Sequence, residues 1–323
     1  MKLRNAWIIV GVSAALTVVA LEALAADDCN TTSQCREKYG SAATDCLNSQ
    51  SSTSVCMCGG SRCASTPNPD PAPTGSVLGR IAVSSDGNFA DCDDLFATAV
   101  TVAILAKTGN ASKLRYYGHS DHLWGTEGGC KDGNREAAMQ RSSAETARLY
   151  GGFDLSVFIN AKANRETAIN RLKDEINRST SSNPLWIIAA GPMEVVGQAL
   201  SRAASSRRQY VTVISHSTWN DNHADRPSGG ESHRGWTWDE IGRMSSPPKR
   251  RHLPDQNGGL RTSHSNFYEW RDASDSRRRW LWSRNRATGL SVADCSDAGM
   301  AYWLATGRVD ERASASEIKA LLR

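Results

Sequence analysis

The chain has 323 residues, 39% of them hydrophobic, and a formal net charge of +4 at pH 7. This small positive surplus argues for neither nucleic acid nor an acidic partner, so a nucleic-acid-binding protein is excluded. After the first 25 residues, no stretch approaches the roughly 18 consecutive apolar residues of a membrane span. The mature chain is therefore not expected to bind a membrane, and a homo-oligomer is left open.

Residues 1–25 are predicted to be a signal peptide. Lys2 and Arg4 make a positive start, residues 7–21 are an apolar run, and Ala-Leu-Ala at 23–25 has the small-x-small pattern that signal peptidase cuts. We expect cleavage before Ala26. The mature protein is then exported, to the periplasm or to the outside of the cell.

Residues 27–65 are predicted to form a small module held together by disulfides. Six of the nine cysteines fall within 35 residues here, and a dense, even cluster in an exported segment is typical of a disulfide framework. A zinc knuckle is the alternative, which export and the lack of any histidine before His119 disfavour. The six cysteines are Cys29, Cys35, Cys46, Cys56, Cys58 and Cys63.

Residues 66–76 alternate proline with small or polar residues, which predicts an extended linker. The linker separates the cysteine-rich module from a larger domain at 77–323. A stapled module on such a linker suits adhesion to a substrate, but a simple spacer accounts for it equally well.

The larger domain alternates strand-like and helix-like patterns. Short apolar strands separated by helices indicate βαβ units, and hence an α/β fold with a mostly parallel central sheet and helices on both faces. The predicted strands are 78–84, 114–117, 155–159, 185–189 and 210–214, and the helices between them lie near 93–108, 134–150, 165–179 and 193–204.

The most informative segment is I-A-V-S-S-D-G-N-F-A-D-C-D-D-L at 81–95. A strand-like run leads into a loop with four carboxylates, Asp86, Asp91, Asp93 and Asp94, and a helical pattern follows. Four acids in nine residues repel one another unless a cation or shared protons offset the charge. Clustered oxygen donors suit a hard ion such as calcium. The alternative, helix capping with the remaining acids solvated, requires one or two carboxylates and not four.

In three segments the chain resembles the calcium-dependent nucleoside hydrolases. The aspartate loop is similar to the family's D-x-D-x-x-x-D-D fingerprint. A-A-G-P-M-E-V at 189–195 is similar to its strand–G-P-L-T-N–helix turn, and S-D-A-G-M-A-Y-W-L at 296–304 to its late helix. The match looks closest to exported nucleoside hydrolase-like proteins found with bacterial polysaccharide-degrading systems. It implies a nucleoside hydrolase-like fold for the larger domain.

The resemblance also implies a calcium site and its roles. Asp86 matches the general base that acts on a calcium-bound water and also ligates the metal. Asp94 matches the bidentate ligand, with Asp93 beside it. The carbonyl of Ala190 matches a main-chain ligand, and Asp297 the late aspartate ligand. The water would attack an anomeric carbon through an oxocarbenium-like transition state.

Several positions depart from the family pattern. The first aspartate lies three residues further from the D-D pair, and the inserted Asp91 could take over a ligand position. Ser84 stands two places before the first aspartate, and Glu194 and Val195 replace the Thr-Asn of the turn. These departures do not support nucleoside specificity. Export favours a glycan or glycoside, because salvage of nucleosides inside the cell needs no signal peptide.

A polar segment at 215–225 follows a predicted strand and should lie at the same sheet edge as the aspartate loop. His216 or His223 could protonate a leaving group near neutral pH, and His216 is the predicted catalytic residue. An ordinary polar loop is the alternative. The predicted substrate contacts are Asn88, His122, Trp124, Glu194, Trp219, Asn220, Asp221 and Asn222.

The sequence therefore predicts an exported, calcium-dependent glycosidase that hydrolyses a glycosidic or N-glycosidic bond of a carbohydrate or glycoside. The alternative is a non-catalytic carbohydrate-binding protein that keeps the metal loop to hold sugar hydroxyls.

Overall fold

The computed structural model describes residues 77–87, 91–123, 136–223, 235–307 and 312–323, together with three short strands nearer the N-terminus. Strands β1 (Asp45–Leu47), β2 (Val55–Cys58) and β3 (Ser61–Arg62) form an antiparallel sheet in that order. These strands fall inside the predicted cysteine-rich module. The module's disulfides, the signal peptide and the linker lie outside the described residues.

The larger domain is built on one sheet of six strands, in the order β6-β5-β4-β7-β8-β9. Every neighbouring pair of strands is parallel. The predicted α/β class with a mostly parallel sheet is therefore confirmed. The strands are β4 (Arg80–Ser85), β5 (Leu114–His119), β6 (Phe158–Asn160), β7 (Leu185–Ala190), β8 (Val211–Ser215) and β9 (Lys249–His252).

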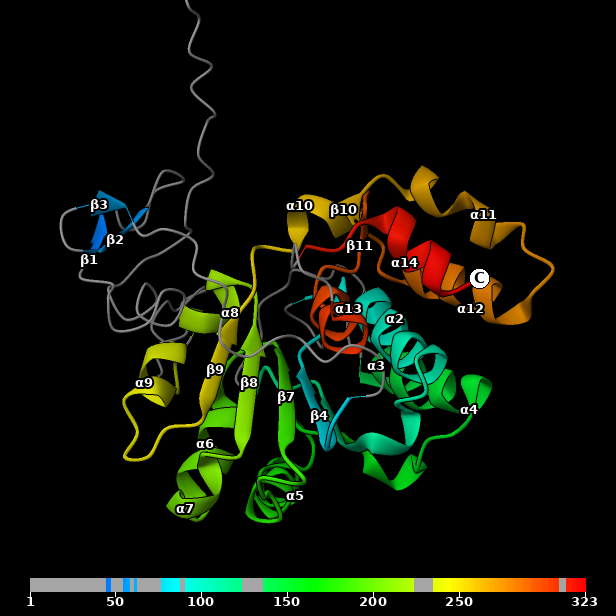
Figure 1. The fold of residues 1–323 in the computed structure, drawn as a ribbon. Helices are drawn as coiled ribbons and strands as arrows, with labels where there is room; N and C mark the ends of the chain where they lie inside the picture. The colour runs from blue at the N-terminus through cyan, green and yellow to red at the C-terminus, as the bar shows by residue number, and fades with distance from the viewer. Residues whose placement is uncertain are drawn as a thin grey trace, which may run out of the picture.

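Helices cover both faces of the sheet (Figure 1). One face packs against α2 (Asp94–Lys107), α13 (Ala298–Thr306) and α14 (Ala315–Leu321). The other face packs against α5 (Arg165–Asn177) and α6 (Glu194–Arg202). Residues 94–105 of α2 are all buried, because α12 and α13 enclose it from outside; a helix apolar on every side is typical of such a position.

Shorter elements connect these layers. A continuous helical segment is formed by α3 (Glu136–Gln140), the π-helix η3 (Arg141–Glu145) and α4 (Thr146–Tyr150). Among the described residues, no helix has the length and apolar character needed to cross a bilayer. The remaining elements are η2 (Ala111–Lys113), η4 (Leu155–Val157), α7 (Ser205–Arg208), α8 (Thr218–Asn222), α9 (Trp238–Gly242), α10 (Asn257–Leu260), β10 (Arg261–Thr262), η6 (His264–Phe267), α11 (Tyr268–Arg271), α12 (Ser276–Ala287) and β11 (Ala293–Asp294).

The basic sequence K-R-R-H at 249–252 forms strand β9, which pairs with β8. An edge strand pairs on one side only, so its sequence carries little apolar signal. Arg250 and Arg251 lie over the rings of Trp238 and Trp303, 5.1 and 5.2 Å from the ring centroids. Their stems thus cover apolar surface while their charged ends stack on aromatic faces.

The strand order determines where a ligand can bind. From the central pair β4 and β7, the chain winds outward through β5 and β6 on one side and through β8 and β9 on the other. In open parallel sheets, ligands bind beyond the carboxyl ends of the strands at such a switch point. The loops that leave β4 and β7 meet there, and they begin at Asp86 and Gly191.

Candidate metal centre

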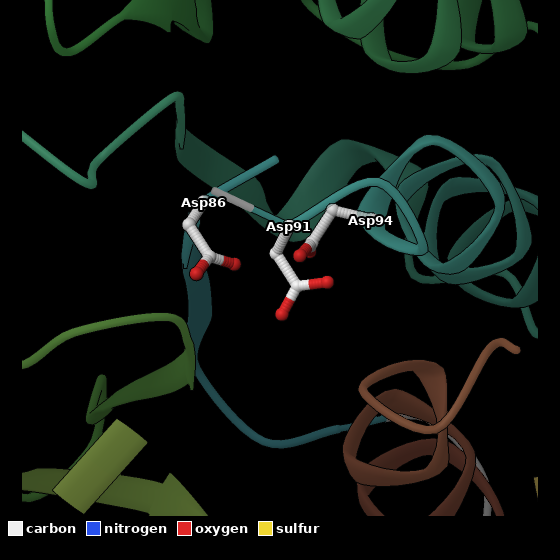
Figure 2. Close-up of side chains that lie close together, drawn as sticks. All are labelled: Asp86, Asp91 and Asp94. Carbon is white, nitrogen blue, oxygen red and sulfur yellow. The ribbon is translucent and has the colours of Figure 1, made fainter. Parts of the chain in front are cut away.

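Three carboxylate groups gather at the loop between β4 and α2, and Figure 2 shows them side by side. Asp86, Asp91 and Asp94 each offer an oxygen, and these atoms lie within 4.8 Å of one another. Asp86 and Asp94 are buried, whereas Asp91 is half-buried. Asp93, at the N-cap of α2, lies outside this three-carboxylate cluster, and its side chain caps no backbone N–H.

Local contacts hold the three-carboxylate cluster in place. Gly87 has a φ of 94°, and a side chain there would clash with Asp94 and Met139, so the turn after β4 requires glycine. The Ser85 hydroxyl donates to Asp94 Oδ1 at 2.9 Å. Cys92, inside the loop, is disulfide-bonded, which anchors the backbone between two of the acids.

Burial governs the electrostatics of the cluster. It raises the pKa of both Asp86 and Asp94 well above the ordinary value, and the charges of Asp91 and Asp297 raise both further. Burial, followed by the charges of Asp297 and Asp294, raises the pKa of Asp91 to about 8. These carboxyl groups are therefore harder to ionise than free aspartates.

The donor set fits a hard divalent cation. Oδ2 of Asp86 and Oδ2 of Asp94 are buried and have no hydrogen-bond partner, which is costly for carboxylate oxygens. Within the described part of the chain, no lysine or arginine offsets the charge at either residue. Arg261 lowers the pKa of Asp91 but pairs with Asp294 at 3.6 Å. Calcium, which takes about six to eight oxygen ligands, would satisfy both the charge and the free oxygens.

Asp121 is a further buried carboxylate beside the cluster. It follows β5 and accepts a 2.5 Å hydrogen bond from the Ser84 hydroxyl at Oδ2, while its Oδ1 has no partner. Burial raises the pKa of Asp121 to about 7, and the charge of Asp297 adds to that effect. The sequence places Asp121 in the segment 119–124, with His119, His122 and Trp124, after the second predicted strand. Its position just after the second strand of the sheet was the available signal.

The turn after β7 approaches the acids very closely. The Asp86 backbone N–H donates to the Ala190 carbonyl at 3.1 Å, so this predicted main-chain ligand lies directly beside the predicted base. A Cβ atom on Gly191 would clash with Asp121 Oδ1 and come within 2.9 Å of the Asp86 backbone nitrogen. Glycine is therefore needed at this position for reasons of space.

His216 joins the late aspartate to the strand ends. Its Nε2 lies 2.8 Å from Asp297 Oδ1, and its Nδ1 lies 3.8 Å from Asp255 Oδ1. Burial alone would lower the pKa of His216, but hydrogen bonds and charges from Asp255 and Asp297 outweigh burial and raise it to about 9. The Gln256 backbone N–H donates to Nδ1 at 3.4 Å, so Nδ1 faces an amide donor as well as the Asp255 carboxylate. Asp297 lies close enough for its charge to raise the pKa of Asp86 and Asp94.

Two predicted contact residues, His122 and Trp219, form an aromatic group with His223 above the sheet edge. His122 follows β5 and His223 follows α8, and their Nε2 atoms lie 2.8 Å apart. The ring of Trp219 lies against His223, with centroids 3.9 Å apart, and remains 38% exposed. Two loops that are distant in sequence therefore build one wall, with an exposed indole that a flat ligand could cover.

Other predicted contacts are already engaged by the protein. Asp221 is fully buried and accepts from Ser215 Oγ at 2.7 Å, and it lies 2.8 Å from His252 Nε2. Glu194 accepts from the Trp236 backbone N–H at 2.8 Å and from the Gln198 side chain.

The remaining predicted contacts are Asn220, Asn222, Asn88 and Trp124. Asn222 donates to the Thr218 carbonyl at 3.2 Å, and Asn220 is buried. Asn88 and Trp124 lie outside the described residues.

Comparison with known proteins gives one relative at the sequence level. Uncharacterized protein P22 of Formosa agariphila is 33% identical over 257 residues, which cover 76% of this chain and 90% of that protein. No family model matches the chain. A solved structure of a plant nucleoside hydrolase, the PpNRh1 enzyme, is 7% identical with a TM-score of 0.43, and the match covers 71% of this chain and 79% of that one. That similarity is too low to establish a shared fold.

Proposed function

The chain belongs to the same family as protein P22 of Formosa agariphila, and we propose that it is an exported, calcium-dependent glycosidase with a nucleoside hydrolase-like fold. The observation that carries the proposal is the three-carboxylate cluster, whose buried oxygens without partners suit a bound cation. The cluster's place at the switch point of the sheet supports it, as do the three sequence segments that resemble nucleoside hydrolases.

In this proposal the three aspartates of the cluster have different roles, in binding the cation and in accepting a proton. A bound cation supplies the positive charge that makes a water molecule easier to deprotonate. Asp91 and Asp94 hold the cation with their carboxylate oxygens. Asp86 contributes one oxygen to it and accepts the proton of the attacking water with the other. Trp219 offers an exposed aromatic face on which a sugar ring can stack.

His216 acts as a positioning residue in this proposal. Its Nε2 lies against Asp297 and its Nδ1 accepts the Gln256 backbone N–H, so neither ring nitrogen is directed at a leaving group. The hydrogen bond to Asp297 fixes that carboxylate near the cluster, the role that outer-shell partners of metal ligands commonly have.

Calcium is expected to raise the melting temperature of the purified protein. An ion that binds only the native state stabilises it by about 2.7 kcal/mol at 100 times its Kd. For a domain of this size that is a shift of roughly 5–10 °C. Differential scanning calorimetry with calcium and with a chelator measures it. Asp94→Ala should abolish the shift, and Asp93→Ala, outside the cluster, should keep it. Elemental analysis without a divalent ion, together with no shift, would contradict the site.

His216→Ala is expected to weaken calcium binding about 10–100-fold, because removal of an outer-shell partner typically has that cost. Isothermal titration with calcium measures the change. His216→Gln, which keeps a donor, should recover part of the affinity, whereas His264→Ala, at a histidine bonded to Asn285 and Leu290, should leave it unchanged. If His216→Ala bound calcium as tightly as the unaltered protein, the proposed positioning role of His216 would be contradicted.

Activity is tested with the full chain, calcium, and a panel of glycans, glycosides and nucleosides. Release of reducing ends or of a free base supports the enzyme, and chelation should stop it. Binding of sugars without any turnover would favour a carbohydrate-binding protein that uses the same cluster.

A further inference from the structure

A cavity lies at the free edge of the sheet, beside strand β6. Its volume is about 640 Å³, within the range of roughly 300–1,000 Å³ typical of ligand pockets. Residues 158–160 of β6 line it, and so do residues from α4 and α5. These helices belong to opposite faces of the sheet: α4 packs against α2, and α5 packs into the core of the other face.

The lining of this cavity, which we call the edge pocket, is rich in hydrogen-bond donors. Arg148 reaches it from α4 and Arg171 from α5, and no aspartate or glutamate is among its lining residues. Arg148 forms no ion pair with any described residue. Arg171 uses one guanidinium N–H to donate to the Ser156 carbonyl at 2.9 Å, which leaves its other donors for a ligand.

Amide and hydroxyl groups complete the lining, and two acids touch it from outside. Gln140 and Thr167 add polar groups. Glu136 accepts from Asn160 Nδ2 at 3.1 Å, and Asp154 accepts from the Ser156 backbone N–H at 2.9 Å. Among the described residues, neither acid forms a salt bridge with Arg148 or Arg171.

The edge pocket adjoins the metal centre. His119, in its lining, is the last residue of β5 and lies one strand away from Ser85. Gln140, also in the lining, follows Met139, which packs against Gly87 in the aspartate loop. The edge pocket therefore lies beside the strand end and the helical segment that border the aspartate loop.

We propose that the edge pocket binds an anionic substituent of the substrate, a carboxylate or a sulfate ester on a sugar, through Arg148 and Arg171. Guanidinium groups bind both anions with paired N–H donors, and two of them from opposite walls favour an anion over a neutral sugar. This inference rests on the proposed glycosidase function only in taking the anion to be part of a sugar substrate. The binding itself needs no calcium and no turnover.

Isothermal titration of the full chain in calcium-free buffer tests this proposal, with oligogalacturonate, dextran sulfate and neutral dextran as probes. Calcium is left out because it binds the anionic probes. We expect one or both anionic probes to bind and dextran to bind far more weakly. Arg148→Gln with Arg171→Gln should weaken binding by about tenfold per arginine, since charge-assisted hydrogen bonds have roughly that value. Arg178→Gln, an exposed arginine on the same stretch of chain, should change it little.

The outcomes separate the two proposals. Oligogalacturonate binding alone identifies a carboxylate ligand, and dextran sulfate binding alone a sulfate ester. Equal binding of dextran, an unchanged affinity in the double variant, or an equal loss in Arg178→Gln would overturn the edge pocket. Turnover of neutral glycans would then leave the glycosidase standing. Anion binding that depends on both arginines, without turnover of any glycan, would support the edge pocket as an anion site and contradict the proposed glycosidase activity.

Discussion

Asp86→Asn is expected to lower turnover by about 10²–10⁴-fold, the usual contribution of a positioned general base. The amide keeps an oxygen that can contact calcium, so calcium affinity should fall only in part. Asp94→Ala is expected to abolish calcium binding and activity together, because it removes a fully buried ligand from the three-carboxylate cluster.

The two substitutions are measured side by side, by isothermal titration with calcium and by an activity assay on the same preparations. Asp93→Ala is the matched control, since Asp93 is in the same loop but outside the cluster. Full activity in Asp86→Asn would make Asp91 the better candidate for the base. Calcium binding that survives in Asp94→Ala would contradict the ligand set.

Gly191→Ala is expected to destabilise the protein by about 1–3 kcal/mol, as overpacking of a closely packed position does. The new methyl group would clash with Asp121 Oδ1 and crowd the Asp86 backbone N–H. Relief of the clash must move the turn that carries the Ala190 carbonyl, or the loop that carries Asp86. Calcium affinity should therefore fall together with stability.

Urea unfolding with and without calcium measures both effects of Gly191→Ala. Gly258→Ala is the control, because the nearest atoms to a side chain there belong to the flexible end of Arg312. If Gly191→Ala retained full stability and full calcium affinity, the close approach of Gly191 to the acids would have no role in the site.

The alternation of strands and helices was predictable from the sequence, because it depends on local patterns. The apolar run that became β7 and the long apolar helix α2 are each visible within a short window of residues. Strand β9 was not predictable, since K-R-R-H has no apolar side and its strand conformation depends on pairing with β8. The π-helix η3 has no local signal either.

The nine residues of the aspartate loop also combine a feature that is predictable from the sequence with one that depends on the tertiary structure. Sequence spacing brings all four acids near one another, since they are joined by a short loop. The direction in which α2 begins decided which of them converge, because it turns Asp94 toward Asp86 and leaves Asp93 outside.

The sequence by itself therefore determined the α/β class and the acidic loop at a strand's end, since both arise from residues that are neighbours in the chain. Only the tertiary structure decided the partners of that loop. Asp121 and Gly191 approach the acids from the ends of other strands. The hydrogen bond between His216 and Asp297 joins two residues that are 81 positions apart in the chain. Arg148 and Arg171 meet at one pocket because the sheet ends between their helices. Such contacts depend on strand order, which no local pattern encodes.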